Sequence, residues 1–225
     1  MFTTAVRTKT AACAGLAAAA AIALLPASPS QAGHTPKCFG KAATIVGTNG
    51  ADTGAGALIG TNGKDVIAGL GGGDEIIGRG GNDLICSGDG ADGVFGGEEL
   101  NYQTETGGGN DKINGGKKQD YLRGGGENDL IKGGGTADRL EGNMGNDKIT
   151  GGEAADLLEG GEDTDNLDGG ANADSVDGGP GDSDLVKGGD GADGLSGGDG
   201  VDDTCDGGPG SDGDTGGCEN LISVP

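Results

Sequence analysis

An aspartate recurs in one register at nine-residue intervals along most of the 225-residue chain. Reading from Gly60, four consecutive segments are GTNGKDVIA, GLGGGDEII, GRGGNDLIC and SGDGADGVF, and each has aspartate as its sixth residue. After an interruption the register continues to Asp212, with one-residue slips near the end. Its members are Asp65, Asp74, Asp83, Asp92, Asp111, Asp120, Asp129, Asp138, Asp147, Asp156, Asp165, Asp174, Asp184, Asp193, Asp202 and Asp212. A repeat of this length predicts a stack of small, similar units.

The residue two positions after each aspartate is aliphatic in all but two units, where Thr204 and Asp214 occupy that position. The six residues before each short strand hold glycines that suit turns with positive φ. Each unit is therefore expected to be a turn followed by a strand with one inward residue. Since one aliphatic side chain cannot form a core, we expect an all-β solenoid of about 16 units, two per coil.

Composition excludes a collagen-like repeat and limits the classes of molecule that the chain can bind. The chain has 56 glycines, but glycine does not recur at every third position, so collagen is excluded. Without residues 1–32 the chain keeps 12 basic and 37 acidic residues, a net charge of −25. Such a charge attracts cations and repels nucleic acid and anionic lipid, so we expect no nucleic-acid partner. The charge does not exclude a protein partner.

The N-terminus resembles a secretory signal peptide over residues 1–32. Arg7 and Lys9 precede the apolar stretch Ala11 to Leu25, and Ser30-Gln31-Ala32 is typical of a cleavage site. No segment reaches the roughly 20 apolar residues that a bilayer span needs, so no membrane anchor is expected. We therefore expect a secreted, extracellular protein with an N-terminal cap and imperfect first unit over 33–59, a repeat domain over 60–215 and a C-terminal cap over 216–225.

Four cysteines remain in the expected mature chain, an even number that predicts two disulfides in an exported protein. Three connectivities are possible. Our hypothesis is that Cys38 pairs with Cys86, which ties residues 33–46 down as a cap on the first coil, and that Cys205 pairs with Cys218 to close the last coil. None of the cysteines has the C-x-x-C spacing of a zinc site.

Segments such as GRGGNDLIC (78–86) and GNMGNDKIT (142–150) resemble the G-G-x-G-x-D-x-U-x nonapeptide of the repeats-in-toxin (RTX) calcium-binding family. The resemblance covers about residues 47–215 and implies a right-handed parallel β-roll with several Ca²⁺ ions between coils. Carried over, it pairs Asp65 with Asp83, Asp74 with Asp92, Asp184 with Asp202, and Asp193 with Asp212. The resemblance implies as metal ligands Asp65, Asp74, Asp83, Asp92, Asp111, Asp147, Asp184, Asp193, Asp202 and Asp212, and more weakly Asp52, Asp120, Asp129, Asp138, Asp156, Asp165 and Asp174.

Two regions depart from the family pattern. Residues 96–105 form a degenerate unit with Asn101 in place of aspartate, which predicts a bulged loop. A divergent middle block, residues 115–177, loses the glycine at position four of its units, so it is either a metal-free roll or a looser segment. The replacing residues are Lys118, Glu127, Thr136, Ala154, Asp163 and Asn172.

The small core indicates that folding needs a cation. Fourteen aliphatic side chains contribute roughly 20 to 40 kcal/mol, whereas ordering the chain costs on the order of 200 kcal/mol in conformational entropy. Stacked coils also place carboxylates about 5 Å apart, where they repel one another. Calcium, which accepts six to eight hard oxygen ligands, reverses that repulsion. We therefore expect folding on calcium binding; the alternative is a permanently disordered acidic coil.

Catalytic motifs are weak in this sequence. Gly194-Leu195-Ser196-Gly197-Gly198 matches a hydrolase nucleophile motif, but Leu195 occupies an inward repeat position and His34 is the only histidine. Gly88, Gly90 and Gly93 match a dinucleotide fingerprint without a strand-then-helix unit around them. We therefore expect a calcium-binding protein that is not an enzyme. The alternative is an adhesion, interaction or ice-binding-like solenoid in which calcium is only structural.

Overall fold

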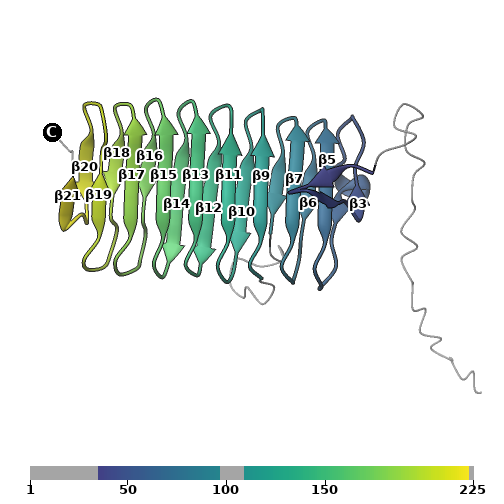
Figure 1. Cartoon of the computed structure of the whole chain (residues 1–225), viewed down its shortest axis with the longest axis horizontal. Coiled ribbons are helices and arrows are strands. Elements are labelled where there is room, and N and C mark those ends of the chain that lie inside the picture. The colour runs from purple at the N-terminus through teal and green to yellow at the C-terminus, as the bar shows by residue number, and fades with distance from the viewer. Residues whose placement is uncertain (1–34, 97–108, 223–225) are drawn as a thin grey trace, which may run out of the picture. The chain divides into compact units, whose positions relative to one another are not determined.

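The chain forms a parallel β-solenoid. The computed structural model describes residues 35–96 and 109–222, which belong to one compact unit, Ala32–Pro225. Two parallel sheets of nine and ten strands face each other, and a short antiparallel hairpin accompanies them (Figure 1). Within the described ranges the helical structure is a single 3-10 turn, Gly54–Gly56, and no helix is long and apolar enough to cross a bilayer. The all-β solenoid expected from the repeat is therefore confirmed.

Strands alternate between the two sheets along the chain. The ten-stranded sheet contains β3 (Ile45–Val46), β5 (Val66–Gly71), β7 (Leu84–Asp89), β9 (Lys112–Gly116), β11 (Leu130–Gly134), β13 (Lys148–Glu153), β15 (Asn166–Ala171), β17 (Leu185–Asp190), β19 (Thr204–Asp206) and β21 (Asn220–Ile222). The nine-stranded sheet contains β4 (Leu58–Ile59), β6 (Glu75–Ile77), β8 (Gly93–Phe95), β10 (Tyr121–Gly125), β12 (Arg139–Met144), β14 (Leu157–Glu162), β16 (Ser175–Asp177), β18 (Gly194–Ser196) and β20 (Gly213–Gly216). Each coil thus contributes one strand to each sheet.

The inward aliphatic residues form the core between the two sheets. They pair in register with the next coil, as Ile131 does with Ile149 and Leu122 with Leu140. The fully buried members are Ile67, Ile76, Ile85, Val94, Ile113, Leu122, Ile131, Leu140, Ile149, Leu158, Leu167, Val186, Leu195 and Cys205. Cys205 occupies the place that the sequence register gave to Thr204. Each coil therefore buries one large side chain from each sheet.

The middle block, residues 115–177, is part of the same roll. Strands β9 to β16 keep the register of their neighbours, so the alternative of a looser segment is wrong. Glu127, Ala154, Asp163 and Asn172 adopt the left-handed conformation that glycine has elsewhere, with φ between 71° and 82°. Left-handed backbone costs a non-glycine residue about 1–2 kcal/mol, and stacking with both neighbouring coils imposes it here.

The N-terminal hairpin packs on an outer sheet face. Strands β1 (Lys37–Cys38) and β2 (Lys41–Ala42) are antiparallel, and Cys38 packs with Val66, Ala68 and Leu84. The disulfide Cys38–Cys86 fixes the hairpin to this face. The segment predicted to cap the first coil thus has two parts: Ile45 of β3, the end strand of the ten-stranded sheet, packs against the core, and the hairpin covers the outer face of β5 and β7.

One junction between coils interrupts the regular spacing. Strand β7 pairs with β9, and β8 with β10, across residues 97–108, so paired residues are 28 apart instead of 18. Side-chain contacts cross this junction: the Ser87 hydroxyl donates to the Gly115 carbonyl, Lys117 pairs with Asp89 at 2.8 Å, and Phe95 meets Tyr121 edge to face at 5.9 Å. Side chains therefore strengthen the pairing between these two coils.

We expect Tyr121→Ala to weaken this junction. The substitution removes the ring contact with Phe95, the contact of Arg139 with the ring face and the hydrogen bond to Glu141. A loss of about 1–3 kcal/mol in the free energy of unfolding follows, measured by denaturant titration in calcium. Lys117→Gln is the control, because both partners of its ion pair are mostly exposed and the pair contributes little. Equal losses for the two variants would contradict this role of the ring.

Three predictions fall partly or wholly outside the described residues: the signal peptide over 1–32, most of the degenerate unit over 96–105, and the last three residues of the C-terminal cap. The C-terminal disulfide, by contrast, lies within the described residues. Cys205 is bonded to Cys218, which packs against the end of the core, so both disulfides match the pairings proposed from the sequence.

Candidate metal centre

The register aspartates form two continuous ladders, one at each edge of the solenoid. The backbone N–H of each aspartate donates to Oδ1 of the aspartate one coil later, as Asp111 does to Asp129 at 2.8 Å. The first ladder contains Asp65, Asp83, Asp111, Asp129, Asp147, Asp165, Asp184 and Asp203. The second contains Asp52, Asp74, Asp92, Asp120, Asp138, Asp156, Asp174, Asp193 and Asp212. Hydrogen bonding thus joins three of the four expected pairs: Asp65–Asp83, Asp74–Asp92 and Asp193–Asp212.

The fourth expected pair is wrong. Asp184 donates to Asp203, which is fully buried, whereas Asp202 is exposed and lies outside the ladder with φ 66°. Ladder partners near this end are 19 residues apart, as for Asp165 and Asp184, so each coil is one residue longer there. Since stacking pairs coil with coil, Asp203 takes the ladder position and Cys205 the core position.

The neighbours Asp202 and Asp203 provide a matched test. We expect Asp203→Asn to lower the stability of the calcium-loaded protein by about 1–3 kcal/mol, because a buried amide donor replaces a buried carboxylate oxygen. Asp202→Asn makes the same change in charge at an exposed position and should leave the unfolding temperature unchanged. Thermal unfolding followed by circular dichroism measures both, and the assignment is wrong if Asp202→Asn has the larger effect.

Different side chains end the ladders. At the N-terminal coil the hydroxyl and N–H of Thr48 donate to Asp52, and those of Thr61 donate to Asp65. At the other end Glu219 accepts the N–H of Asp203 at 2.9 Å, where the next aspartate would stand. The repeat register did not reveal these residues, although Thr-Asn-Gly occurs before both N-terminal aspartates. Hydroxyl donors therefore satisfy the carboxylates at the N-terminal end of the two ladders.

Inside the roll, most ladder carboxylates keep one oxygen without a partner. Among the described residues, Oδ2 is buried and accepts no hydrogen bond in fifteen aspartates. They are Asp74, Asp83, Asp92, Asp111, Asp120, Asp129, Asp138, Asp147, Asp156, Asp165, Asp174, Asp184, Asp193, Asp203 and Asp212. Buried polar atoms are rarely left unpaired in native proteins. A regular row of such oxygens therefore requires either protons or cations.

Burial raises the pKa of most of the ladder carboxyls. Desolvation is the largest cause, the hydrogen bond from the previous coil opposes it, and for most of them neighbouring aspartates add repulsion. The pKa is raised to about 9 for Asp129, about 8 for Asp165 and about 7 for Asp120. At neutral pH many of these groups would therefore hold a proton unless a cation replaced it.

Backbone oxygens lie beside the unpaired carboxylate oxygens. A Cβ built on Gly142 would lie within 3.0 Å of both Asp147 Oδ2 and the Gly160 carbonyl oxygen, and Gly160 meets Asp165 and Gly178 in the same way. These oxygens are the hard ligands that Ca²⁺ prefers, at flexible geometry. No three acidic, histidine or cysteine side chains converge in the described ranges, so a cation here would need carbonyl ligands as well. The donor set fits calcium.

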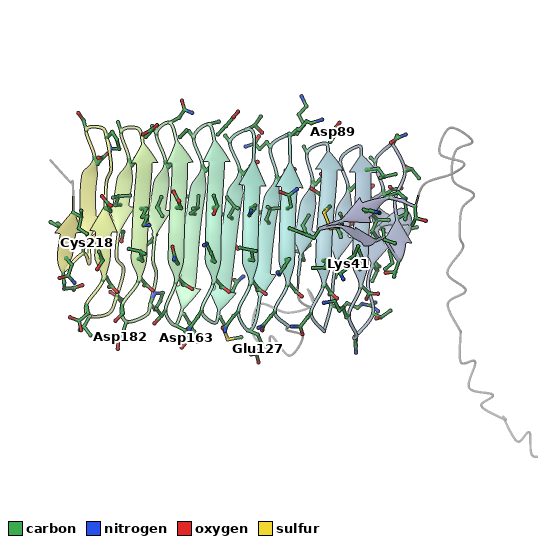
Figure 2. The ribbon with its side chains drawn as sticks, in the orientation of Figure 1. Lys41, Asp89, Glu127, Asp163, Asp182 and Cys218 are labelled. Carbon is green, nitrogen blue, oxygen red and sulfur yellow. A yellow bond between two sulfur atoms is a disulfide. The ribbon has the colours of Figure 1, made fainter. Side chains whose placement is uncertain are left out.

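A second row of polar side chains runs outside the first ladder and was not predicted. The N–H of Asn146 donates to Asn128 Oδ1 at 2.8 Å, and that of Thr164 to Asn146 Oδ1 at 3.2 Å. Glu127, Asp163 and Asp182 mark this edge, opposite Asp89 (Figure 2). The sequence does contain a signal for this row, because the residue before the register aspartate differs between the two ladders. In the first ladder asparagine precedes Asp83, Asp111, Asp129 and Asp147, whereas in the second ladder alanine precedes Asp92, Asp138, Asp156, Asp174 and Asp193. The two edges therefore differ chemically.

Comparison with models of known protein families identifies a repeat family. The RTX calcium-binding nonapeptide repeat family, in its four-copy form, matches residues 59–94, 105–140, 115–149, 123–158 and 150–185, which together cover just over half of the chain. These segments contain most of both ladders. No curated protein matches the chain.

Proposed function

Because the chain belongs to the RTX calcium-binding nonapeptide repeat family, we propose that it is a secreted, non-enzymatic protein that binds several Ca²⁺ ions and folds as it binds them. The observation that carries the proposal is the row of fifteen buried carboxylate oxygens without a protein partner. A polypeptide that had to fold alone would not bury these charges, because each costs several kcal/mol without a counter-charge.

Each ladder aspartate has two tasks in this proposal. Oδ1 accepts the N–H of the previous coil and so fixes the distance between coils, as in Asp129 with Asp147. Oδ2 lies near the carbonyl oxygen of the first glycine in the next coil, and both oxygens would be ligands of the cation. Bound calcium supplies positive charge between carboxylates that otherwise repel one another. Binding and coil stacking are then one event.

The secretion part of the proposal rests on the sequence of residues 1–32 and on the disulfides. Cys38–Cys86 and Cys205–Cys218 join separate elements and suit an oxidising compartment. N-terminal sequencing of the protein from culture medium should find Gly33 as the first residue. A chain that keeps residues 1–32 in the medium would contradict signal cleavage.

The non-enzymatic part rests on the local geometry of the one hydrolase-like motif. Ser196 ends strand β18, and Leu195 before it belongs to the core. A nucleophile elbow needs a strand-to-helix turn instead. Activity of the purified protein on generic ester substrates, abolished by Ser196→Ala, would overturn this part without affecting calcium binding.

The experiment that tests calcium binding is isothermal titration of the oxidised protein with CaCl₂ after chelator treatment and dialysis, at neutral pH. We expect several ions per chain, with affinity in the range of extracellular modules, about 10⁻⁴–10⁻³ M. Magnesium is the control, since it demands a stricter octahedral geometry and should give little heat. Asp163→Asn, at an exposed turn, should bind as the parent does. Absence of calcium-specific heat would contradict the proposal.

A further inference from the structure

One outer sheet face is basic although the chain is strongly acidic. The outward positions of three neighbouring strands, β9, β11 and β13, are occupied by Lys112, Asn114, Leu130, Lys132, Lys148 and Thr150. These six residues are called the basic face below. None of them is acidic, whereas the whole chain has a net charge of −23. The basic face is therefore a local reversal of charge.

The three lysines have no internal partners. All are exposed, and among the described residues none of them makes an ion pair or a hydrogen bond. By contrast, Arg123 and Arg139 on the other sheet both pair with Glu141 at 2.7–2.9 Å. Further along the same face, Lys187 stands beside Asp168 and Asp206 on the neighbouring strands. The three lysines of the basic face, in contrast, align with no acidic residue on the neighbouring strands.

The lysines are spaced by the strand repeat. Lys112 and Lys148 both align with Leu130, which lies between them, so they occupy alternate strands about 10 Å apart. Lys132 projects from the intervening strand two residues further along. The face is a flat parallel sheet, so a ligand would lie across several strands along the solenoid axis (Figure 1).

We propose that the basic face binds an extended acidic polysaccharide that runs along the solenoid axis. A sugar residue in an extended chain is about as long as the distance between strands, about 4.8 Å. Carboxylates on alternate sugars would therefore meet lysines on alternate strands. The side chains of Asn114 and Thr150, beside the lysines, can donate to and accept from sugar hydroxyls.

Other polyanions and partners fit this face less well. The face has no aromatic side chain on which a nucleic-acid base could stack, and the acidic chain repels a densely charged phosphate backbone. Protein interfaces usually centre on buried aromatic or arginine anchors, which are absent from these six positions. A polysaccharide has a lower charge density and many hydroxyls. The proposal does not depend on which ladder sites hold calcium, because the face consists of outward strand positions.

The test measures binding of hyaluronan fragments, which carry a carboxylate on alternate sugars, to the full-length protein in calcium. The face variant is Lys112→Gln/Lys132→Gln/Lys148→Gln, and the control with the same change in charge is Lys64→Gln/Arg79→Gln/Lys118→Gln, three exposed residues in turns between strands. We expect the face variant to bind roughly tenfold to hundredfold more weakly and the control to bind as the parent does. Circular dichroism of each variant separates lost binding from lost folding.

Three results would overturn the proposal. They are absence of hyaluronan binding by the folded parent, equal weakening in face and control variants, and equal or tighter binding of single-stranded DNA. Binding through calcium bridges to acidic side chains would survive in the face variant, so it is distinguished from binding by the lysines. Neutral dextran should not bind, and binding should weaken as NaCl screens the charges.

Discussion

Removal of calcium with a chelator at neutral pH is expected to unfold most of the solenoid. The two ladders bring fifteen unpartnered carboxylate oxygens into the interior, and neighbouring aspartates of one ladder stand one coil apart. Without a cation these groups either ionise and repel one another or take up protons against the solution pH. The core offsets little of this cost, since each coil buries only one large side chain per sheet.

Far-UV circular dichroism measures this effect. The parent protein in calcium should give a β spectrum, lose it in excess chelator and regain it when calcium is restored. Magnesium at equal concentration and NaCl at equal ionic strength are the controls, because general screening acts in both. A β spectrum that persists in chelator would mean that the roll is stable without metal. A spectrum that stays disordered in calcium would mean that the chain does not fold by this route.

The repeat register predicted the solenoid because one physical requirement recurs in every unit. Each coil needs an inward aliphatic residue and a turn aspartate, so Ile131 and Asp129 are recognisable from spacing alone. The register failed at Asp202 because spacing was counted unit by unit, whereas stacking conserves the alignment of whole coils. Counting 19 residues from Asp184 gives Asp203 and brings Cys205 into the core row.

Features that occur once could not be predicted from periodicity. Glu219 replaces an aspartate at the end of the first ladder, and only the folded chain brings it to Asp203. The hairpin of β1 and β2 lies on a sheet face because Val66, Ala68 and Leu84 are apolar at outward positions, a local exception to the mixed flanks of other units. Both depend on contacts between residues distant in the sequence.

Acidification in the presence of chelator is expected to restore the fold that calcium removal destroys. The folded-state pKa of most ladder carboxyls is raised above the ordinary value of 3.8, to about 6 for Asp138 and Asp156, about 8 for Asp165 and about 9 for Asp129. The unfolded chain releases these protons near the ordinary value. The folded state therefore holds more protons between about pH 4 and 9, so its stability is greatest at the acid end and falls as pH rises.

The metal-free protein should thus have a β spectrum near pH 4 to 5 and lose it as the pH rises through the range of about 6 to 9. Asp129→Asn sharpens the test, because a neutral amide removes the need for a proton in the ladder. This variant should keep the metal-free fold to higher pH than the parent, yet it should be less stable than the parent in calcium. Asp163→Asn, at an exposed turn, should shift both curves much less, because it removes only a minor repulsion on Asp147 and Asp165. If acid leaves the metal-free chain disordered, proton uptake by the buried carboxyls is not what replaces the cation, and the ladders would need the metal for its ligand geometry as well as for its charge.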